Sequence, residues 1–130
     1  MLCTACSKRK RREPATPIPA SKRYLSPRIR RVLDEAERRG VRARILSGRY
    51  GLLSPDRRIP WYDQALRSED VPAMAAQLER QLRRLRVEVI ELWARPASTP
   101  GWRPYHDALR HACAAAGVRL RCVVLGSSWH

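Results

Sequence analysis

The pattern of apolar and polar positions along the chain predicts an alternation of strands and helices. Strands are expected at four apolar or alternating runs, at 1–6, 41–46, 87–93 and 118–125. Helices are expected where apolar residues recur every three or four positions, over 27–39, 69–85 and 104–116. Strands that alternate with helices in this way favour parallel pairing, with each helix forming a crossover between strands.

Residues with known end preferences mark the predicted helices. Ser26 suits the N-cap of the first helix, Pro27 suits its first position, and Gly40 suits its end. Ser68 is expected to cap the next helix, with Asp70 favourably placed in its first turn. The helix boundaries are therefore predicted from local chemistry as well as from periodicity.

The order of elements predicts an α/β fold, specifically a three-layer α/β/α sandwich with a mainly parallel four-stranded sheet. The 130 residues suit a single domain over 1–130. Parallel strands end at the same edge of a sheet, so the segments at 6–8, 47–51, 95 and 126–127 should converge there. Open α/β sheets bind ligands at this edge, and we expect the functional site there.

The turn that follows the second predicted strand is the first candidate site. Gly48 and Gly51 bracket Arg49 and Tyr50, and Ser47 precedes them. Glycine permits close approach of a ligand to the backbone. The functional interpretation is a pocket floor, with the planar fork of Arg49 on a phosphate or a base edge and Tyr50 against a base. Tyr50 is also one of the catalytic candidates. The alternative is a structural turn with Tyr50 in the core.

The long segment after this turn carries a second candidate, the pair Tyr62 and Asp63. A carboxylate beside aromatic rings could act as a general base, or it could stabilise the oxocarbenium-like state through which a glycosidic bond breaks. The alternative is that Asp63 caps a helix or turn.

Two further sets of residues lie near the predicted sheet edge. Cys6, Ser7 and Lys8 could hold an anion, and the neighbouring cations could also activate Cys6 as a nucleophile. The alternative is a strand end that leads into a solvated basic run. Tyr105 and His106 begin the last helix; we place Tyr105 among the substrate-binding candidates and His106 among the acid–base candidates.

The charge of the chain favours a polyanionic partner. Its formal net charge is +15, from 27 basic and 12 acidic residues. Nucleic acid or a phosphorylated small molecule would suit such a protein, whereas an arginine-rich solvated surface is the alternative. The cations that could track a phosphate backbone are those at 8–12, 22, 23, 28, 30 and 31, and the stacking candidates are Trp61, Tyr62 and Trp102.

Other features of the composition restrict cofactor and location. No apolar run approaches the ~20 residues of a membrane span, and no signal region precedes the basic start, so we expect a cytoplasmic protein. Cys3 and Cys6 have zinc-like spacing, but Cys113 and Cys122 lie nine apart and give no second pair. We therefore expect no metal and no cofactor, with the four thiols reduced.

Three motifs give the chain a resemblance to a known family. They are Cys-Ser-x-x-Lys at 6–10, Leu-Ser-x-x-Tyr-Gly-Leu-Leu-x-Pro-Asp at 46–56 and Pro-x-Tyr-Asp-x-x-Leu at 60–66. This combination resembles the DUF6884 family over nearly the whole chain, although Gly48 stands where the family commonly has alanine. More remotely, the resemblance extends to YaaA proteins and uracil-DNA-glycosylase-like folds, and it implies nucleic-acid or nucleobase chemistry.

Two main functional hypotheses follow, and a third is a cysteine-based or zinc-stabilised protein. The first is an enzyme that hydrolyses the N-glycosidic bond of a nucleotide or nucleic-acid base, with Lys8 and Arg49 on phosphate, Tyr50 and Tyr62 on the base, and Asp63 orienting water or stabilising the sugar cation. The second is a non-catalytic DNA- or RNA-binding module that uses the same basic edge.

Overall fold

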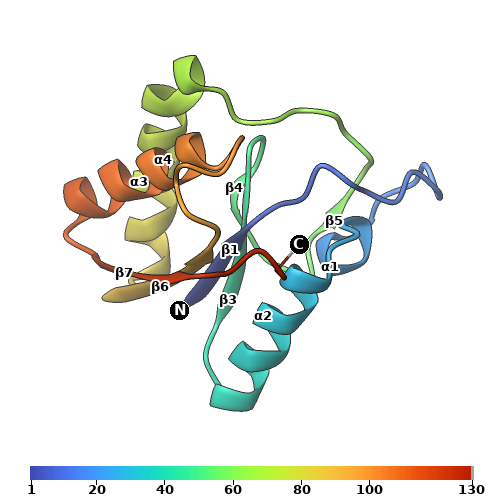
Figure 1. The fold of residues 1–130 in the computed structure, drawn as a ribbon, viewed down its shortest axis with the longest axis horizontal. Coiled ribbons are helices and arrows are strands. Elements are labelled where there is room, and N and C mark those ends of the chain that lie inside the picture. Colours follow the sequence, from blue (N-terminus) through green and yellow to red (C-terminus); the bar gives the residue numbers. More distant parts are fainter. Residues whose placement is uncertain (130) are drawn as a thin grey trace.

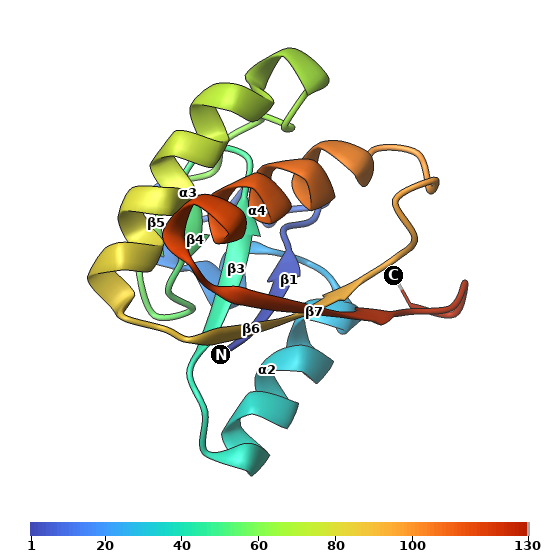
Figure 2. The ribbon, with the colours of Figure 1, turned by 90° about the vertical axis from the view of Figure 1, so that its left-hand side faces the viewer.

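In a computed structural model, which describes residues 1–129, the chain forms a five-stranded sheet with helices on both of its faces (Figures 1 and 2). The strand order is β4-β3-β1-β6-β7. The parallel strands are β1 (Leu2–Ala5), β3 (Ala43–Ser47), β6 (Val89–Ala94) and β7 (Arg119–Val124). These four parallel strands correspond to the four that the sequence predicts, and the α/β class is confirmed.

The prediction of a four-stranded sheet is wrong by one strand. Strand β4 (Gly51–Leu53) turns back after β3 and pairs with it antiparallel, so the sheet is mixed. Gly51 adopts a left-handed φ of 69°, which a residue with a side chain seldom adopts and which reverses the chain here. A separate two-stranded sheet pairs β2 (Ile18–Pro19) with β5 (Arg58–Ile59), both in segments for which the sequence pattern predicts no strand.

Helix α2 covers one face of the main sheet, and helices α3 and α4 pack together on the other (Figure 2). The bounds are α1 (Ala20–Arg23), α2 (Pro27–Arg39), α3 (Val71–Leu85) and α4 (Arg103–Ala116). Successive residues of β1 face opposite layers: Leu2 packs with Val32 of α2, whereas Cys3 belongs to the core that contains Leu78 and Leu109. Burial on both faces explains why the central strands are so apolar.

The ends of α2 confirm the prediction, but the start of α3 does not. Ser26 Oγ accepts a hydrogen bond from the Ile29 amide, and Gly40 ends α2 in the left-handed region. Ser68, the expected cap of the next helix, instead begins a short 3-10 turn (Ser68–Asp70). The carboxylate of Asp70 accepts a hydrogen bond from the Arg67 amide, so the chain tightens before α3 begins.

Arg23 holds the basic segment that follows β1 against the body of the protein. Its side chain is fully buried and donates hydrogen bonds to the carbonyls of Arg11, Pro14, Thr16 and Ile59. Arg23 was one of the cations expected to follow a phosphate backbone. It is instead a structural residue, because its guanidinium N–H groups donate to carbonyls within the protein.

Strand β7 forms the outer edge of the main sheet beyond β6. Arg119, Arg121 and Val124 of this strand are exposed. Of the helices in residues 1–129, none is long and apolar enough to cross a membrane.

Candidate functional site

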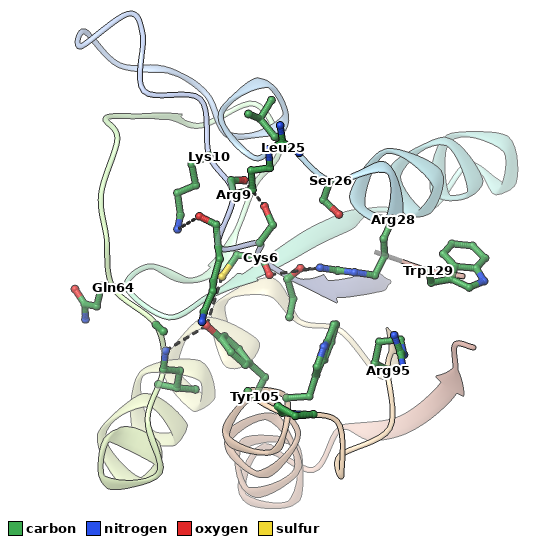
Figure 3. Close-up of a pocket in the computed structure, with 18 of the residues that line it drawn as sticks. Cys6, Arg9, Lys10, Leu25, Ser26, Arg28, Gln64, Arg95, Tyr105 and Trp129 are labelled. Atoms are coloured by element: carbon green, nitrogen blue, oxygen red, sulfur yellow. Dashed lines mark hydrogen bonds between the residues drawn. The ribbon is translucent and has the colours of Figure 1, made fainter. Parts of the chain in front are cut away.

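A cavity of about 990 Å³ opens at the carboxyl ends of β1 and β6 (Figure 3). Strand β1 is followed through α2 by β3 on one side, whereas β6 is followed through α4 by β7 on the other. The winding of the sheet therefore changes direction between β1 and β6. Such a switch point is where doubly wound α/β sheets characteristically hold ligands, because the two flanking helices diverge and leave a crevice.

The lining of this cavity is strongly basic. It includes five cationic residues, Lys8, Arg9, Lys10, Arg28 and Arg95, and a single carboxylate, Asp63. Asp63 is exposed and, within residues 1–129, has no hydrogen bond or ion pair, although its charge acts on Lys10: burial lowers the pKa of Lys10, and Asp63 opposes this shift. The cavity thus has several hydrogen-bond donors that can bind an anion. It also has one carboxylate without an ion-pair partner among the described residues, which could take part in a reaction.

Arg28 is the most deeply placed of these cations. Its side chain is 4% exposed and donates to Thr4 Oγ1 at 2.5 Å and to the Ala5 carbonyl at 2.7 Å. Its Nε atom has no hydrogen-bond partner within residues 1–129, and its guanidinium carbon lies 4.8 Å from the centre of the Trp102 ring. Burial lowers the pKa of Arg28 to about 10, which leaves it charged at neutral pH.

Cys6 and Tyr105 meet at the floor of the cavity. Cys6 Sγ lies 3.6 Å from the Tyr105 hydroxyl, which also accepts a hydrogen bond of 3.2 Å from the Leu66 amide. Burial raises the pKa of Tyr105, so its phenol stays protonated at neutral pH. Ser7 also lines the cavity, and its hydroxyl donates to the Arg9 carbonyl at 2.7 Å.

The turn after β3 lies beside the end of β1 but outside this lining. The Cys6 amide donates to the Leu46 carbonyl at 2.9 Å, which brings the two segments together as expected. Ser47 is fully buried, and its Oγ accepts from the amides of Arg49 and Tyr50. Ser47, Gly48, Arg49, Tyr50 and Gly51 do not line the cavity.

Gly48 allows another part of the chain, rather than a ligand, to approach its backbone closely. A Cβ atom at this position would lie 2.8 Å from the Leu66 amide nitrogen and 3.0 Å from the Gln64 carbonyl oxygen. The segment that contains Asp63 therefore passes directly over Gly48. The glycine helps to position that segment, because any larger residue would displace its backbone.

Tyr62 and His106 have internal partners. The Tyr62 hydroxyl lies 2.5 Å from that of Tyr24 and 2.8 Å from Ser47 Oγ, and the residue is 4% exposed. His106 Nε2 lies 2.8 Å from the Arg95 carbonyl oxygen, which can only accept, so Nε2 carries the proton of this bond. Neither residue lines the large cavity.

Of the residues predicted from the sequence, Cys6, Ser7, Lys8, Asp63 and Tyr105 come together around the cavity. Arg95 and Trp129 also line it. The sequence placed position 95 at this edge but gave Arg95 no role, and it did not indicate Trp129. Arg28 and Trp102 entered only as surface cation and stacking candidate. Arg28 lies in the first turn of α2 and Trp102 is the N-cap residue of α4, and these positions were a usable signal because both helix starts lie at the ligand-binding edge of the sheet.

No cluster of three His, Cys, Asp or Glu side chains suited to a metal ion occurs within residues 1–129. All four cysteines are free thiols, and only Cys6 lines the cavity.

Comparison with known proteins identifies the family of the chain but no individual protein that resembles it. No curated protein and no solved structure matches the chain, and nothing in these comparisons supports the more remote relation to YaaA or uracil-DNA-glycosylase-like proteins. The family match covers residues 1–127, nearly all of the sequence. The chain belongs to DUF6884, a family of unknown function.

Proposed function

We propose that the protein binds a phosphorylated nucleoside unit in the cavity between β1 and β6 and hydrolyses its N-glycosidic bond. One observation carries the proposal: five cations, aromatic rings and a single unpaired carboxylate line the same cavity at the switch point of the sheet. The remote resemblance to glycosylase-like proteins suggests the same reaction class and remains part of the proposal.

In this proposal the phosphate lies between Lys8 and the buried Arg28, and the base packs against Trp102 or Tyr105. The guanidinium of Arg28 is held by Thr4 and Ala5, so it contributes a fixed positive charge, and the exposed Lys8 contributes donors that are free within residues 1–129. Trp102 offers an aromatic face for the base and already holds the guanidinium of Arg28 nearby.

Asp63 is the proposed catalytic residue. As the C1′–N bond breaks, the bonding electron pair leaves with the base and positive charge develops on the sugar. Asp63 stabilises this charge and takes a proton from the attacking water, whose oxygen bonds to C1′. The proton then passes to the departing base or to solvent. Tyr50 and His106, which were catalytic candidates, have no part in this scheme because they lie outside the lining.

Release of free base from a panel of nucleoside monophosphates and nucleic acids, followed by chromatography, tests the proposal. We expect Asp63→Asn to lower the rate on the order of 100-fold or more while binding, measured by calorimetry, is retained. Asp34→Asn is the matched control, because Asp34 is an exposed carboxylate on α2 outside the cavity. Base release by Asp63→Asn at the wild-type rate would refute the assignment.

The second candidate is binding of DNA or RNA without catalysis. The net charge of +15 and the cations around the cavity favour it. It predicts strongly salt-dependent binding, no base release by the wild-type protein, and no difference between wild type and Asp63→Asn in turnover. We also expect the protein to act in the cytoplasm, where its four free thiols would stay reduced.

A further inference from the structure

A second, smaller cavity adjoins the first. Its volume is about 230 Å³, and it shares Lys8, Arg9, Lys10 and Asp63 with the larger one. The rest of its lining consists of Arg12, Trp61 and Tyr62. Asp63 therefore stands at the junction of two basic cavities and is the only carboxylate in the lining of either.

The smaller cavity repeats the chemistry of the larger one. The guanidinium carbon of Arg12 lies 4.7 Å from the centre of the Trp61 ring, as that of Arg28 lies 4.8 Å from the Trp102 ring. Trp61 is 37% exposed, a large apolar ring in contact with solvent. Lys10 Nζ lies 4.6 Å from the centre of the Tyr62 ring. Each cavity thus combines cations with aromatic faces.

The segment that carries these cations is held in place by the backbone. The Leu25 amide donates to the Arg9 carbonyl at 2.9 Å, and the Arg11 amide donates to the Arg23 carbonyl at 2.7 Å. In Figure 3, Lys10 lies on one side of the large cavity, and Arg95 and Trp129 lie on the other. Cations and aromatic rings therefore lie on both sides of the large cavity, and Asp63 lines both cavities.

We infer that the smaller cavity holds the nucleotide next to the one in the large cavity, so that the substrate is a single-stranded nucleic acid. This inference rests on the proposed function. A single strand presents phosphates together with unpaired bases, which suit cations and exposed aromatic rings in the same groove. A duplex keeps its bases stacked inside and presents mainly phosphates, so it would offer Trp61 no base to stack on.

The test compares the affinities of three probes, a nucleoside 5′-monophosphate, a mixed-sequence single-stranded 10-mer and the same 10-mer as a duplex. We expect the single strand to bind at least tenfold more tightly than either other probe. Trp61→Ala should weaken single-strand binding on the order of tenfold, the effect of losing one base–aromatic stack, and should leave the monophosphate within twofold of wild type. Trp61→Phe should retain most of the affinity.

A second test variant, Arg12→Ala, and one control, Arg84→Ala, separate this effect from general electrostatics. Arg12→Ala removes an exposed charge from the smaller cavity and should weaken single-strand binding severalfold. Arg84→Ala removes an exposed charge on α3, which lines neither cavity, and should change affinity much less. Equal affinity for the monophosphate and the single strand would overturn the inference, as would duplex binding as tight as that of the single strand. Either result leaves the proposed function standing, whereas failure to bind any probe would overturn both.

Discussion

Two neighbouring strand ends at one edge of the sheet differ in what their polar groups contact. After β1, Lys8 and the deeper Arg28 line an open cavity, and Arg28 Nε has no partner within residues 1–129. After β3, Ser47 accepts two backbone amides and pairs with Tyr62, and the backbone of Leu66 crosses over Gly48. At the end of β3, the Ser47 hydroxyl therefore bonds to the amides beside it and to Tyr62 rather than facing a cavity.

This contrast shows that a position at the carboxyl end of a parallel strand does not by itself indicate a binding site. Glycines, a serine, an arginine and a tyrosine at such a position also suit a turn that holds its neighbours. What separates the two regions is the presence of a cation without an internal partner: the exposed Lys8 ammonium group has none within residues 1–129, whereas Ser47 Oγ is bonded to two amides and to Tyr62. A hydrogen-bonding group that is already satisfied has little left to offer a ligand.

The largest effect that would test the contrast is on stability, at Ser47. Ser47→Ala removes a buried hydroxyl that serves two backbone amides and Tyr62, so we expect the free energy of unfolding to fall by about 2–3 kcal/mol. Urea denaturation measures it. Ser98→Ala, at an exposed position, is the control and should change little. A Ser47 variant as stable as wild type would mean that the turn does not depend on this network.

The tyrosines beneath the turn predict loss of stability in alkali. Burial raises the pKa of Tyr24 and Tyr62 above the ordinary value near 10. Above about pH 10 the unfolded chain therefore binds fewer protons than the folded protein, and stability falls as pH rises further. The free energy of unfolding, measured by urea denaturation at several pH values above about 10, should fall less steeply with pH for Tyr24→Phe than for wild type. If the free energy of unfolding fell equally steeply with pH in both proteins, Tyr24 would not cause this loss of stability.

At the end of β1 the expected effect is on binding. Lys8 is exposed and lines both cavities, so Lys8→Ala should weaken binding of a nucleoside monophosphate by about fivefold, with little change in stability. Calorimetric titration measures the affinity. A Lys8 variant that binds as wild type does would remove this residue from the proposed phosphate site.

The smallest effect is expected at Arg49. Its guanidinium carbon lies 5.4 Å from the ring of the adjacent Tyr50, and the side chain is exposed outside both cavities. Arg49→Ala should change ligand affinity less than twofold and stability by less than about 0.5 kcal/mol. A loss of affinity as large as that of Lys8→Ala would place the ligand at the turn after all and would erase the contrast.

The parts of the fold that could be predicted are those with local causes. Ser26, Pro27 and Gly40 define α2 through capping chemistry that needs no distant partner. Strand β4 was missed because it has three residues and exists only through its pairing with β3. Short elements of this kind depend on tertiary contacts, which no window of sequence contains.

The sequence likewise predicted those parts of the site that follow from strand order, but not those that depend on distant partners. Topology alone placed Cys6, Ser7 and Lys8 at the sheet edge, and they line the cavity. The internal role of Ser47 depends on Tyr62, fifteen residues away, and so could not be read locally. The periodicity of α2 likewise did not reveal that the guanidinium of Arg28 reaches the carbonyl of Ala5 beneath the end of β1.

The outer strand β7 bears on how the protein behaves at high concentration. An uncovered edge offers backbone donors and acceptors to a second copy, and charged side chains along such an edge discourage that pairing. Arg119 and Arg121 are exposed on β7 near the amino-terminal half of the strand, and Val124 is 63% exposed at its far end. Two molecules that met through this edge would bring four guanidinium groups together, so we expect their mutual repulsion to oppose self-association through β7.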